Sequence, residues 1–257
     1  MLSLRSMSIT AACGLAAVAQ AGIVYQTSFE RPGHTVGVLP QFPPNPAVQD
    51  NWFQLDGNIF NVTNNVARSG SQSVAANTTN QPNASRWALR STPLDGSLPE
   101  NNIIESSVWV RMDANDNANR LSRAGLDIYD STGANRIAAL GIQSDGVLRA
   151  IDGVSSTFDL ANGLALGEWY KLTITVIFST GKVQFSLNEN LLGFGAHSAV
   201  DFGDADLWMI GFKPNPDTAP GIGHQAYFDD YSIAVIPAPG TLALLGLGAI
   251  AARRRRA

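Results

Sequence analysis

The chain has 257 residues with 17 basic and 21 acidic side chains, and its formal net charge is −4 at neutral pH. An acidic chain repels phosphate backbones, so a nucleic-acid partner is not expected. Because the chain has a single cysteine, an internal disulfide framework is excluded.

The N-terminal residues 1–21 have the pattern of a secretory signal peptide. Arg5 precedes an apolar centre over Ile9–Val18, and the segment ends in the small-x-small tripeptide Ala19–Ala21. We expect signal peptidase to cut after this tripeptide, which removes Cys13, the only cysteine. A buried N-terminal helix and a lipoprotein acylated at Cys13 are the alternatives.

The charge of the chain is distributed unevenly. Every acidic residue lies between Glu30 and Asp230, whereas five basic residues, Arg5 and Arg253–Arg256, lie in the terminal segments. Residues 22–235 therefore keep 12 basic against 21 acidic side chains, a net charge of −9. This charge suits a secreted soluble domain and is compatible with a bound divalent cation.

Residues 22–235 are predicted to form one all-β domain, because short alternating apolar segments recur between turn residues. The Asp145-Gly146 turn is a strong hairpin signal, since glycine readily adopts the positive φ of such turns. About a dozen strands require two stacked antiparallel sheets, because one open sheet of that size would expose an apolar face. The expected strands include Ile103–Met112, Gly125–Asp130, Arg136–Ile142, Val147–Ile151, Trp169–Phe178, Val183–Leu187, Leu207–Phe212 and Ala226–Val235.

Four segments mark the order of these strands: the opening Thr27–Glu30, then Ser69–Val74, Gly167–Leu172 and the closing Tyr227–Ile233. Their order resembles the concanavalin-like, or laminin-G-like, jelly roll. The resemblance covers nearly the whole exported body. It implies an antiparallel two-sheet jelly-roll sandwich over residues 22–235.

The same resemblance implies a structural calcium ion. In related carbohydrate-binding jelly rolls the ion is held by a glutamate of a Phe-Glu pair and an aspartate of an Asp-Asp pair, and this chain has Phe29-Glu30 and Asp229-Asp230 at those places. Calcium prefers hard oxygen ligands such as these. Since neighbouring strand residues face opposite ways, only one of Asp229 and Asp230 is expected to face the ion. Ordinary carboxylates in water are the alternative.

Catalytic motifs are missing from the expected strands. Laminarinase-type glycosidases share the jelly roll and need two carboxylates about 5 to 5.5 Å apart, in a Glu-x-Asp-x-Glu-like run. The nearest segment has Asp127 alone, with Gly125 and Tyr129 at the two glutamate positions. We therefore expect a non-enzymatic protein, and a secreted glycoside hydrolase or lyase on the same fold is the alternative.

The five tryptophans are candidates for stacking on sugar rings, since an aromatic ring suits both apolar and hydroxylated surfaces. Trp52 and Trp87 have polar neighbours and are the expected exposed pair for contact with an extracellular polysaccharide. Trp109 and Trp169 lie within strongly apolar strands, where burial is the default. We expect those two tryptophans to fill the core.

Residues 236–257 combine a proline-rich start, an apolar run over Thr241–Ala252 and a basic end. The basic end consists of four consecutive arginines: Arg253, Arg254, Arg255 and Arg256. An apolar helix of about 12 to 17 residues spans only about 18 to 25 Å, slightly less than a hydrocarbon core of about 30 Å, and arginine side chains make up the difference. Because arginines remain on the cytoplasmic side, we expect everything before Pro237 to face outward.

This tail resembles the PEP-CTERM sorting signal, which consists of a Pro-Glu-Pro-like motif, an apolar helix and a basic end. The chain has Pro237, Ala238 and Pro239 before Gly240, so alanine replaces the glutamate of the motif. The resemblance implies an exosortase-type sorting enzyme as partner, and a plain C-terminal membrane anchor is the alternative. We expect an exported protein that is anchored through the helix and then acts at the cell surface or in an extracellular matrix, by display, adhesion or glycan contact.

Overall fold

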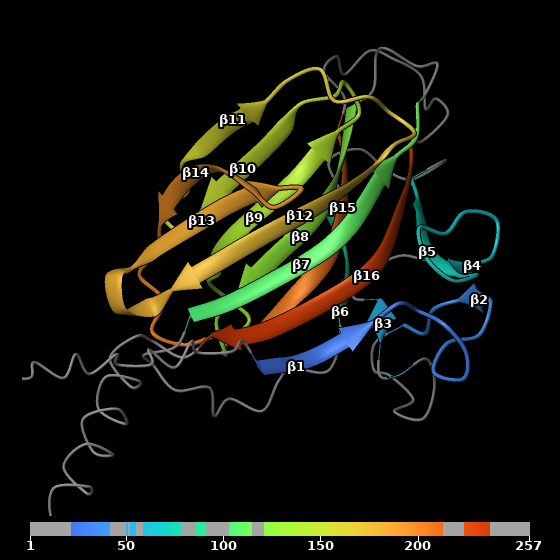
Figure 1. Ribbon diagram of the computed structural model, residues 1–257, viewed down its shortest axis with the longest axis horizontal. Helices are drawn as coiled ribbons and strands as arrows, with labels where there is room; N and C mark the ends of the chain where they lie inside the picture. The colour runs from blue at the N-terminus through green and yellow to red at the C-terminus, as the bar shows by residue number, and fades with distance from the viewer. Residues whose placement is uncertain are drawn as a thin grey trace, which may run out of the picture.

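The computed structural model describes residues 22–41, 50, 52–54, 59–78, 86–90, 103–114, 121–212 and 224–236, with residues 86–90, 211 and 212 as backbone only. These residues form two antiparallel β-sheets packed face to face (Figure 1). The predicted two-sheet antiparallel sandwich is therefore confirmed.

The larger sheet, sheet A, has nine strands within the described residues. They are β1 (Gly22–Thr27), β2 (Gly37–Val38), β4 (Phe60–Thr63), β5 (Ser73–Asn77), β7 (Ile103–Met112), β12 (Trp169–Ile177), β13 (Lys182–Leu187), β14 (Asn190–Ala196) and β16 (Gln225–Ile236). Their order across the sheet is β14-β13-β12-β7-β16-β5-β4-β2, and β1 also pairs with β16. Strands β7, β12 and β16 lie at the front of Figure 1.

The second sheet, sheet B, has seven strands in the described part of the chain. They are β3 (Phe53–Gln54), β6 (Arg86–Arg90), β8 (Leu121–Tyr129), β9 (Arg136–Gln143), β10 (Leu148–Asp152), β11 (Thr157–Ala161) and β15 (Asp204–Phe212). Their order is β11-β10-β9-β8-β15-β6-β3, and β8 and β9 lie behind sheet A in Figure 1.

The core lies between the inner faces of the two sheets. Strand β7 shows why: Val108 and Val110 are buried, whereas Trp109 and Arg111 between and after them are half-buried on the outer face. Sheet B supplies fully buried side chains such as Leu126 from the other side. Burying one such side chain contributes about 1.5–3 kcal/mol, so period-two alternation over many strands stabilises the sandwich.

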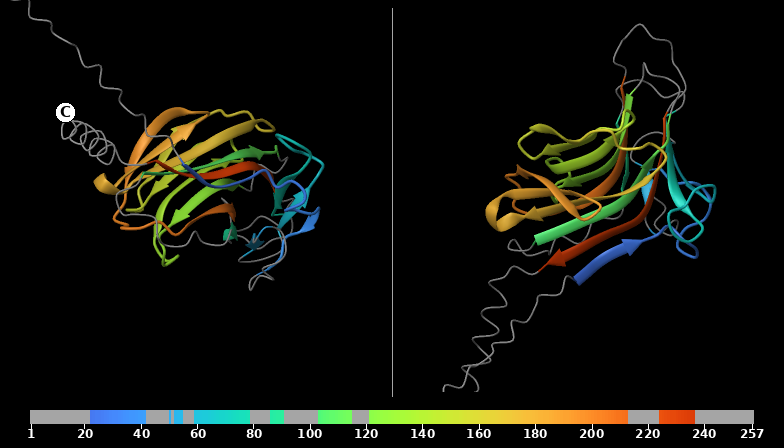
Figure 2. Two further views of the ribbon diagram at one scale, coloured as in Figure 1. Left: turned by 60° about the horizontal axis from the view of Figure 1, so that its bottom comes forward. Right: turned by 45° about the horizontal axis from the view of Figure 1, so that its top comes forward.

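Strand β16 pairs with three strands of sheet A: β7, β5 and β1. Figure 2 shows it in red beside the blue β1. Gly22 at the start of β1 pairs with Val235 near the end of β16. The described body therefore begins and ends at neighbouring positions on sheet A.

Most expected strands are present, with shifted ends. Strand β8 begins at Leu121 rather than at Gly125, and β12 ends at Ile177 because a 3-10 turn follows at Phe178–Thr180. The predicted turn at Gly146 is confirmed by its φ of +81°. Strand β14 was not expected, because its two glycines and adjacent leucines show no clean alternation.

No helix in the described part of the chain is long and apolar enough to cross a membrane. The predicted signal peptide and the predicted C-terminal helix both lie outside the described residues.

Replacing Gly125 with alanine is expected to destabilise the sandwich. A Cβ at this position would overlap the backbone oxygen of Leu140 and lie 2.6 Å from the Cα of Gly141, so β8 and β9 would have to move apart. Such overpacking costs about 1–3 kcal/mol, which denaturant unfolding would measure. Gly33→Ala is the control, because its Cβ would meet nothing closer than 3.7 Å. Equal stability losses in both variants would contradict this account.

Candidate functional site

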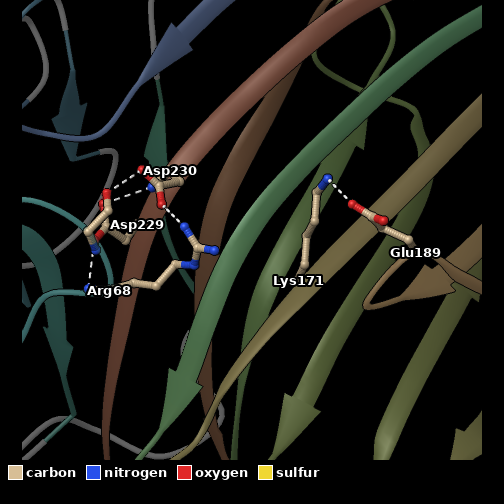
Figure 3. Close-up of polar contacts among 6 residues, drawn as sticks. Arg68, Lys171, Glu189, Asp229 and Asp230 are labelled. Carbon is tan, nitrogen blue, oxygen red and sulfur yellow. Dashed lines mark hydrogen bonds and ion pairs between the residues drawn. The ribbon is translucent and has the colours of Figure 1, made fainter.

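The segment Arg68–Gln72, between β4 and β5, is held against sheet A by carboxylates from elsewhere in the chain (Figure 3). Asp229 accepts hydrogen bonds from the backbone N–H groups of Arg68 at 2.8 Å and Ser69 at 3.1 Å. Asp230 accepts from the Arg68 guanidinium at 2.6 Å and from the Ser69 hydroxyl at 2.7 Å. The two aspartates of β16 therefore hold the first two residues of this segment. We call the whole segment, Arg68–Gln72, the clamped loop.

Glu30 holds the other end of the clamped loop. Its carboxylate accepts from the backbone N–H and the hydroxyl of Ser71, at 2.6 and 2.9 Å, and from the backbone N–H of Gln72 at 2.7 Å. This approach requires glycine at position 70, because a Cβ there would overlap a Glu30 carboxylate oxygen and the φ of Gly70 is +60°. The structure thus brings all three predicted calcium ligands to one loop.

The strand alternation at Asp229 and Asp230 is interrupted. Strand alternation predicts that only one of Asp229 and Asp230 faces a bound ion, and this stays a prediction; in the structure both contact the clamped loop. The reason is a bulge in β16 between Asp229 and Ser232, where Asp230 adopts a φ of +46° and breaks the alternation.

The protonation behaviour of these carboxyl groups differs. Burial raises the pKa of Asp229 from 3.8 to about 6, although the N–H groups of Ser69 and Arg68 act in the opposite sense. Burial also raises the pKa of Glu30, but hydrogen bonds from Ser71 and Gln72 outweigh it and leave this pKa below its usual value. Asp229 is fully buried, so its negative charge is the least well compensated of this set.

These residues have the ligand chemistry that calcium prefers, because all three are carboxylates. A cation beside Asp229 would also relieve the cost of its buried charge. The described residues include no group of three or more His, Cys, Asp or Glu side chains close enough together to hold a metal ion. The calcium site of Glu30, Asp229 and Asp230 therefore stays a prediction.

A groove of about 680 Å³ opens beside the clamped loop, on the outer face of sheet A. This volume lies within the range of about 300–1,000 Å³ that is usual for small-ligand sites. Gln26, Ser107 and Ser232 from three neighbouring strands line it together with Trp109 and Lys171. The Ser107 and Ser232 hydroxyl oxygens lie 2.9 Å apart.

An aromatic ring forms part of the groove wall. The guanidinium carbon of Arg68 lies 3.8 Å from the centroid of the Trp109 ring, a distance suited to a cation–π contact. Lys171 pairs with Trp109 in register on the next strand and reaches Glu189 at 3.4 Å (Figure 3). The clamped loop thus sets the position of Arg68 over Trp109.

The structure corrects the expected roles of the tryptophans. Trp52 is completely buried, so its predicted exposure is wrong: it packs edge-on against Phe29 and Tyr231, with ring centroids 5.3 and 5.1 Å away. Its indole N–H donates to the Tyr25 hydroxyl at 2.8 Å. The expected core position of Trp109 is also wrong, because this ring is half-buried on the outer face of sheet A.

Two further tryptophans complete this comparison. Trp169 is half-buried on β12 rather than in the core, and its partner in register is Arg111 on the outer face. Trp87 lies on β6 opposite Met209, but its side chain is outside the described part of the structure. The ligand-binding role of Trp87 therefore stays a prediction.

One histidine lines the groove, although sequence motifs gave no reason to select it. His34 is 1% exposed, its Nε2 has no hydrogen-bond partner, and its ring lies edge-on to Phe29. Burial lowers the pKa of His34, although the nearby Asp50 carboxylate acts in the opposite sense. Burial of His34 therefore favours its neutral form.

Asp127, the one carboxylate of the glycosidase-like run, is held in an ion pair. Asp127, on β8 of sheet B, is fully buried and accepts from the Arg136 guanidinium at 2.7 Å. Arg136 also donates to it through a second nitrogen at 3.0 Å. Asp127 is therefore held in a two-point pair instead of facing a ligand.

The C-terminal tail matches a family model for the PEP-CTERM protein-sorting motif over residues 235–256. The chain carries a PEP-CTERM sorting motif. This motif marks an exported protein that is anchored in the membrane and then handled by an exosortase-type sorting enzyme. The individual residues predicted for this motif all lie outside the described residues: Pro237, Ala238, Pro239, Gly240, Arg253, Arg254, Arg255 and Arg256.

Solved structures that resemble the sandwich include three with carbohydrate-related names. Cellulose induced protein Cip1 is 17% identical, with a TM-score of 0.51, and the match covers 72% of this chain and 91% of that one. An endo-β-1,4-glucuronan lyase from the fungus Trichoderma reesei is 10% identical, with a TM-score of 0.51, and the match covers 82% and 94%. An alginate lyase from Pseudomonas aeruginosa is 16% identical, with a TM-score of 0.50, and the match covers 77% and 96%.

These likenesses confirm the jelly-roll sandwich. At such identities they concern the fold alone, because one fold carries many activities. Among curated proteins, no sequence matches this chain.

The buried Asp229 generates a pH prediction. Without calcium, its pKa of about 6 in the folded protein lies above the unfolded value of 3.8, so its stabilising contribution is present below about pH 4 and lost as the pH rises through about 6. The shift corresponds to about 3 kcal/mol. We would measure the free energy of unfolding by urea, in the presence of a chelator. Between about pH 4 and about pH 7, the free energy of unfolding of the wild type should fall by this amount relative to that of Asp229→Asn.

Calcium provides the second part of that experiment. If the predicted ion binds, added calcium at neutral pH should raise the melting temperature of the wild type and not that of Asp229→Asn, because the ion compensates the buried charge. Identical pH profiles for both proteins would contradict the burial argument. No effect of calcium on the wild type would remove the calcium prediction.

The sorting motif generates a prediction about the mature protein. Intact mass in the native host should correspond to a chain that begins at Gly22 and ends near Pro239, because cleavage removes both apolar segments. Replacing Arg253–Arg256 with glutamine should leave the tail uncut, since the cytoplasmic stop is lost. A wild-type mass that includes residues 241–257 would instead indicate a plain anchor.

Proposed function

We propose that the protein is an exported, non-enzymatic surface protein that binds an extracellular polysaccharide through the groove on sheet A. The supporting observation is the outward-facing, half-buried Trp109, with Arg68 over its ring and Ser107 beside it on the groove floor. A sugar presents both apolar C–H surfaces and hydroxyl groups. An aromatic ring beside hydroxyl side chains complements both.

The carboxyl groups of the groove support binding rather than hydrolysis. Glycoside hydrolysis needs one carboxyl with a raised pKa beside an ionised one. Hydrogen bonds keep the pKa of Glu30 low, and Asp230 is paired with Arg68. Asp50 accepts a hydrogen bond from the Tyr25 hydroxyl at 2.8 Å. Asp229 has a raised pKa, but it is fully buried beneath the clamped loop and lies outside the groove lining.

The possible bases of the groove also support binding. Proton abstraction requires a base within hydrogen-bond reach of the substrate. His34 is almost completely buried, and the hydroxyl of Tyr231, the tyrosine in the groove lining, donates to the backbone oxygen of Ala205 at 2.8 Å. Because two similar structures are named as lyases, cleavage is nevertheless part of the test.

Replacing Trp109 with alanine should weaken polysaccharide binding at least about ten-fold, because the ring supplies the apolar contact. Affinity electrophoresis of the mature protein in gels with hydroxyethylcellulose, galactomannan or alginate would measure this. Trp169→Ala is the matched control, since Trp169 is also a half-buried outer-face tryptophan of sheet A. Equal losses in both variants would contradict the assignment to the groove.

The same polymers decide between binding and catalysis. Falling viscosity, or new ultraviolet absorbance from an unsaturated uronate, would contradict the non-enzymatic part of the proposal. Normal mobility of the wild type in every gel would contradict glycan binding itself.

A further inference from the structure

The floor of the groove continues across sheet A as a row of short polar side chains, which we call the polar row. Gln26 pairs in register with Ser232, Ser232 with Ser107, Ser107 with Thr173, and Thr173 with Ser186. Strands lie about 4.8 Å apart, so five strands extend the row over about 19 Å. The polar row therefore runs perpendicular to β1, β16, β7, β12 and β13.

Two register pairs of β7 and β12 flank the polar row. Trp109 and Lys171 form the register pair on one side, and Glu105 and Thr175 form the pair on the other. Between them Ser107 is 3% and Thr173 is 7% exposed, whereas Trp109, Lys171, Glu105 and Thr175 are half-buried. The middle of the row is thus less exposed than its flanks.

The charges of the groove balance. Its lining includes three basic residues and three acidic residues: Arg31, Arg68, Lys171, Glu30, Asp50 and Asp230. Arg68 is paired with Asp230, and Lys171 contacts Glu189. The exported body carries a net charge of −9. The negative field of the body would repel a polyanionic chain, and the groove has few unpaired cations to bind it.

We infer that the groove and the polar row bind a neutral, linear polysaccharide that lies across the strands of sheet A, an inference that rests on the proposed function. The hydroxyl groups of Ser107, Thr173 and Ser186 each donate and accept hydrogen bonds, as sugar hydroxyls do. The part of the Trp109 side chain that Arg68 leaves exposed contacts the apolar face of one sugar ring. The alginate and glucuronan in the names of two similar structures are acidic polymers, so the inferred ligand class differs from theirs.

Two polymers with the same backbone test the charge argument. Affinity electrophoresis of the mature protein should show binding to hydroxyethylcellulose that is unchanged by added salt, and binding to carboxymethylcellulose at least about ten-fold weaker. Tighter binding to carboxymethylcellulose that weakens with salt would overturn the inference and leave the proposed function standing. Absence of binding to either polymer, and to the earlier panel, would overturn both.

Two matched variants test the polar row. Thr173→Val keeps the shape of the side chain and removes its hydroxyl, so hydroxyethylcellulose binding should fall about three- to ten-fold. Thr175→Val makes the same change beside the row and should bind like the wild type. Ser186→Ala is a second test further along the row, and melting temperatures confirm that each variant is folded. Wild-type binding by both Thr173→Val and Ser186→Ala would overturn the inference.

Discussion

The candidate site depends on the hydrogen bonds that Asp229 and Asp230 accept from the clamped loop. Asp229 is buried, and an isolated buried carboxylate would cost several kcal/mol, so its N–H partners at Arg68 and Ser69 are essential. The Arg68–Asp230 pair is partly exposed and contributes about 1 kcal/mol or less by itself. Its role is positional, because it places Arg68 over Trp109 and so forms the groove wall.

The jelly roll separates stability from recognition. The inner faces of the two sheets supply the core, and the outer face of sheet A is left for polar and aromatic side chains. The pairing of Gly22 with Val235 places the start of β1 beside the end of β16. The fold alone does not determine a ligand, which is why the proposal rests on the groove.

The sequence predicts the sandwich well because period-two alternation reports which side of a strand faces the core. The same signal in β7 places Val108 and Val110 inward and therefore Trp109 outward. The apolar residues around Trp109 suggested burial instead and hid this signal. Trp52 shows the opposite limit: its polar neighbours suggested exposure, but the rings of Phe29 and Tyr231 pack against it and bury it. The bulge at Asp230 could not be predicted, since a positive φ at aspartate leaves no pattern in the sequence.

The most direct test of the account is a crystal structure of the mature protein with a neutral oligosaccharide such as cellohexaose. The account predicts an intact sugar chain across sheet A, over Ser107 and Thr173, with one ring against Trp109. Sugar bound on the outer face of sheet B, or a cleaved product in the groove, would contradict it.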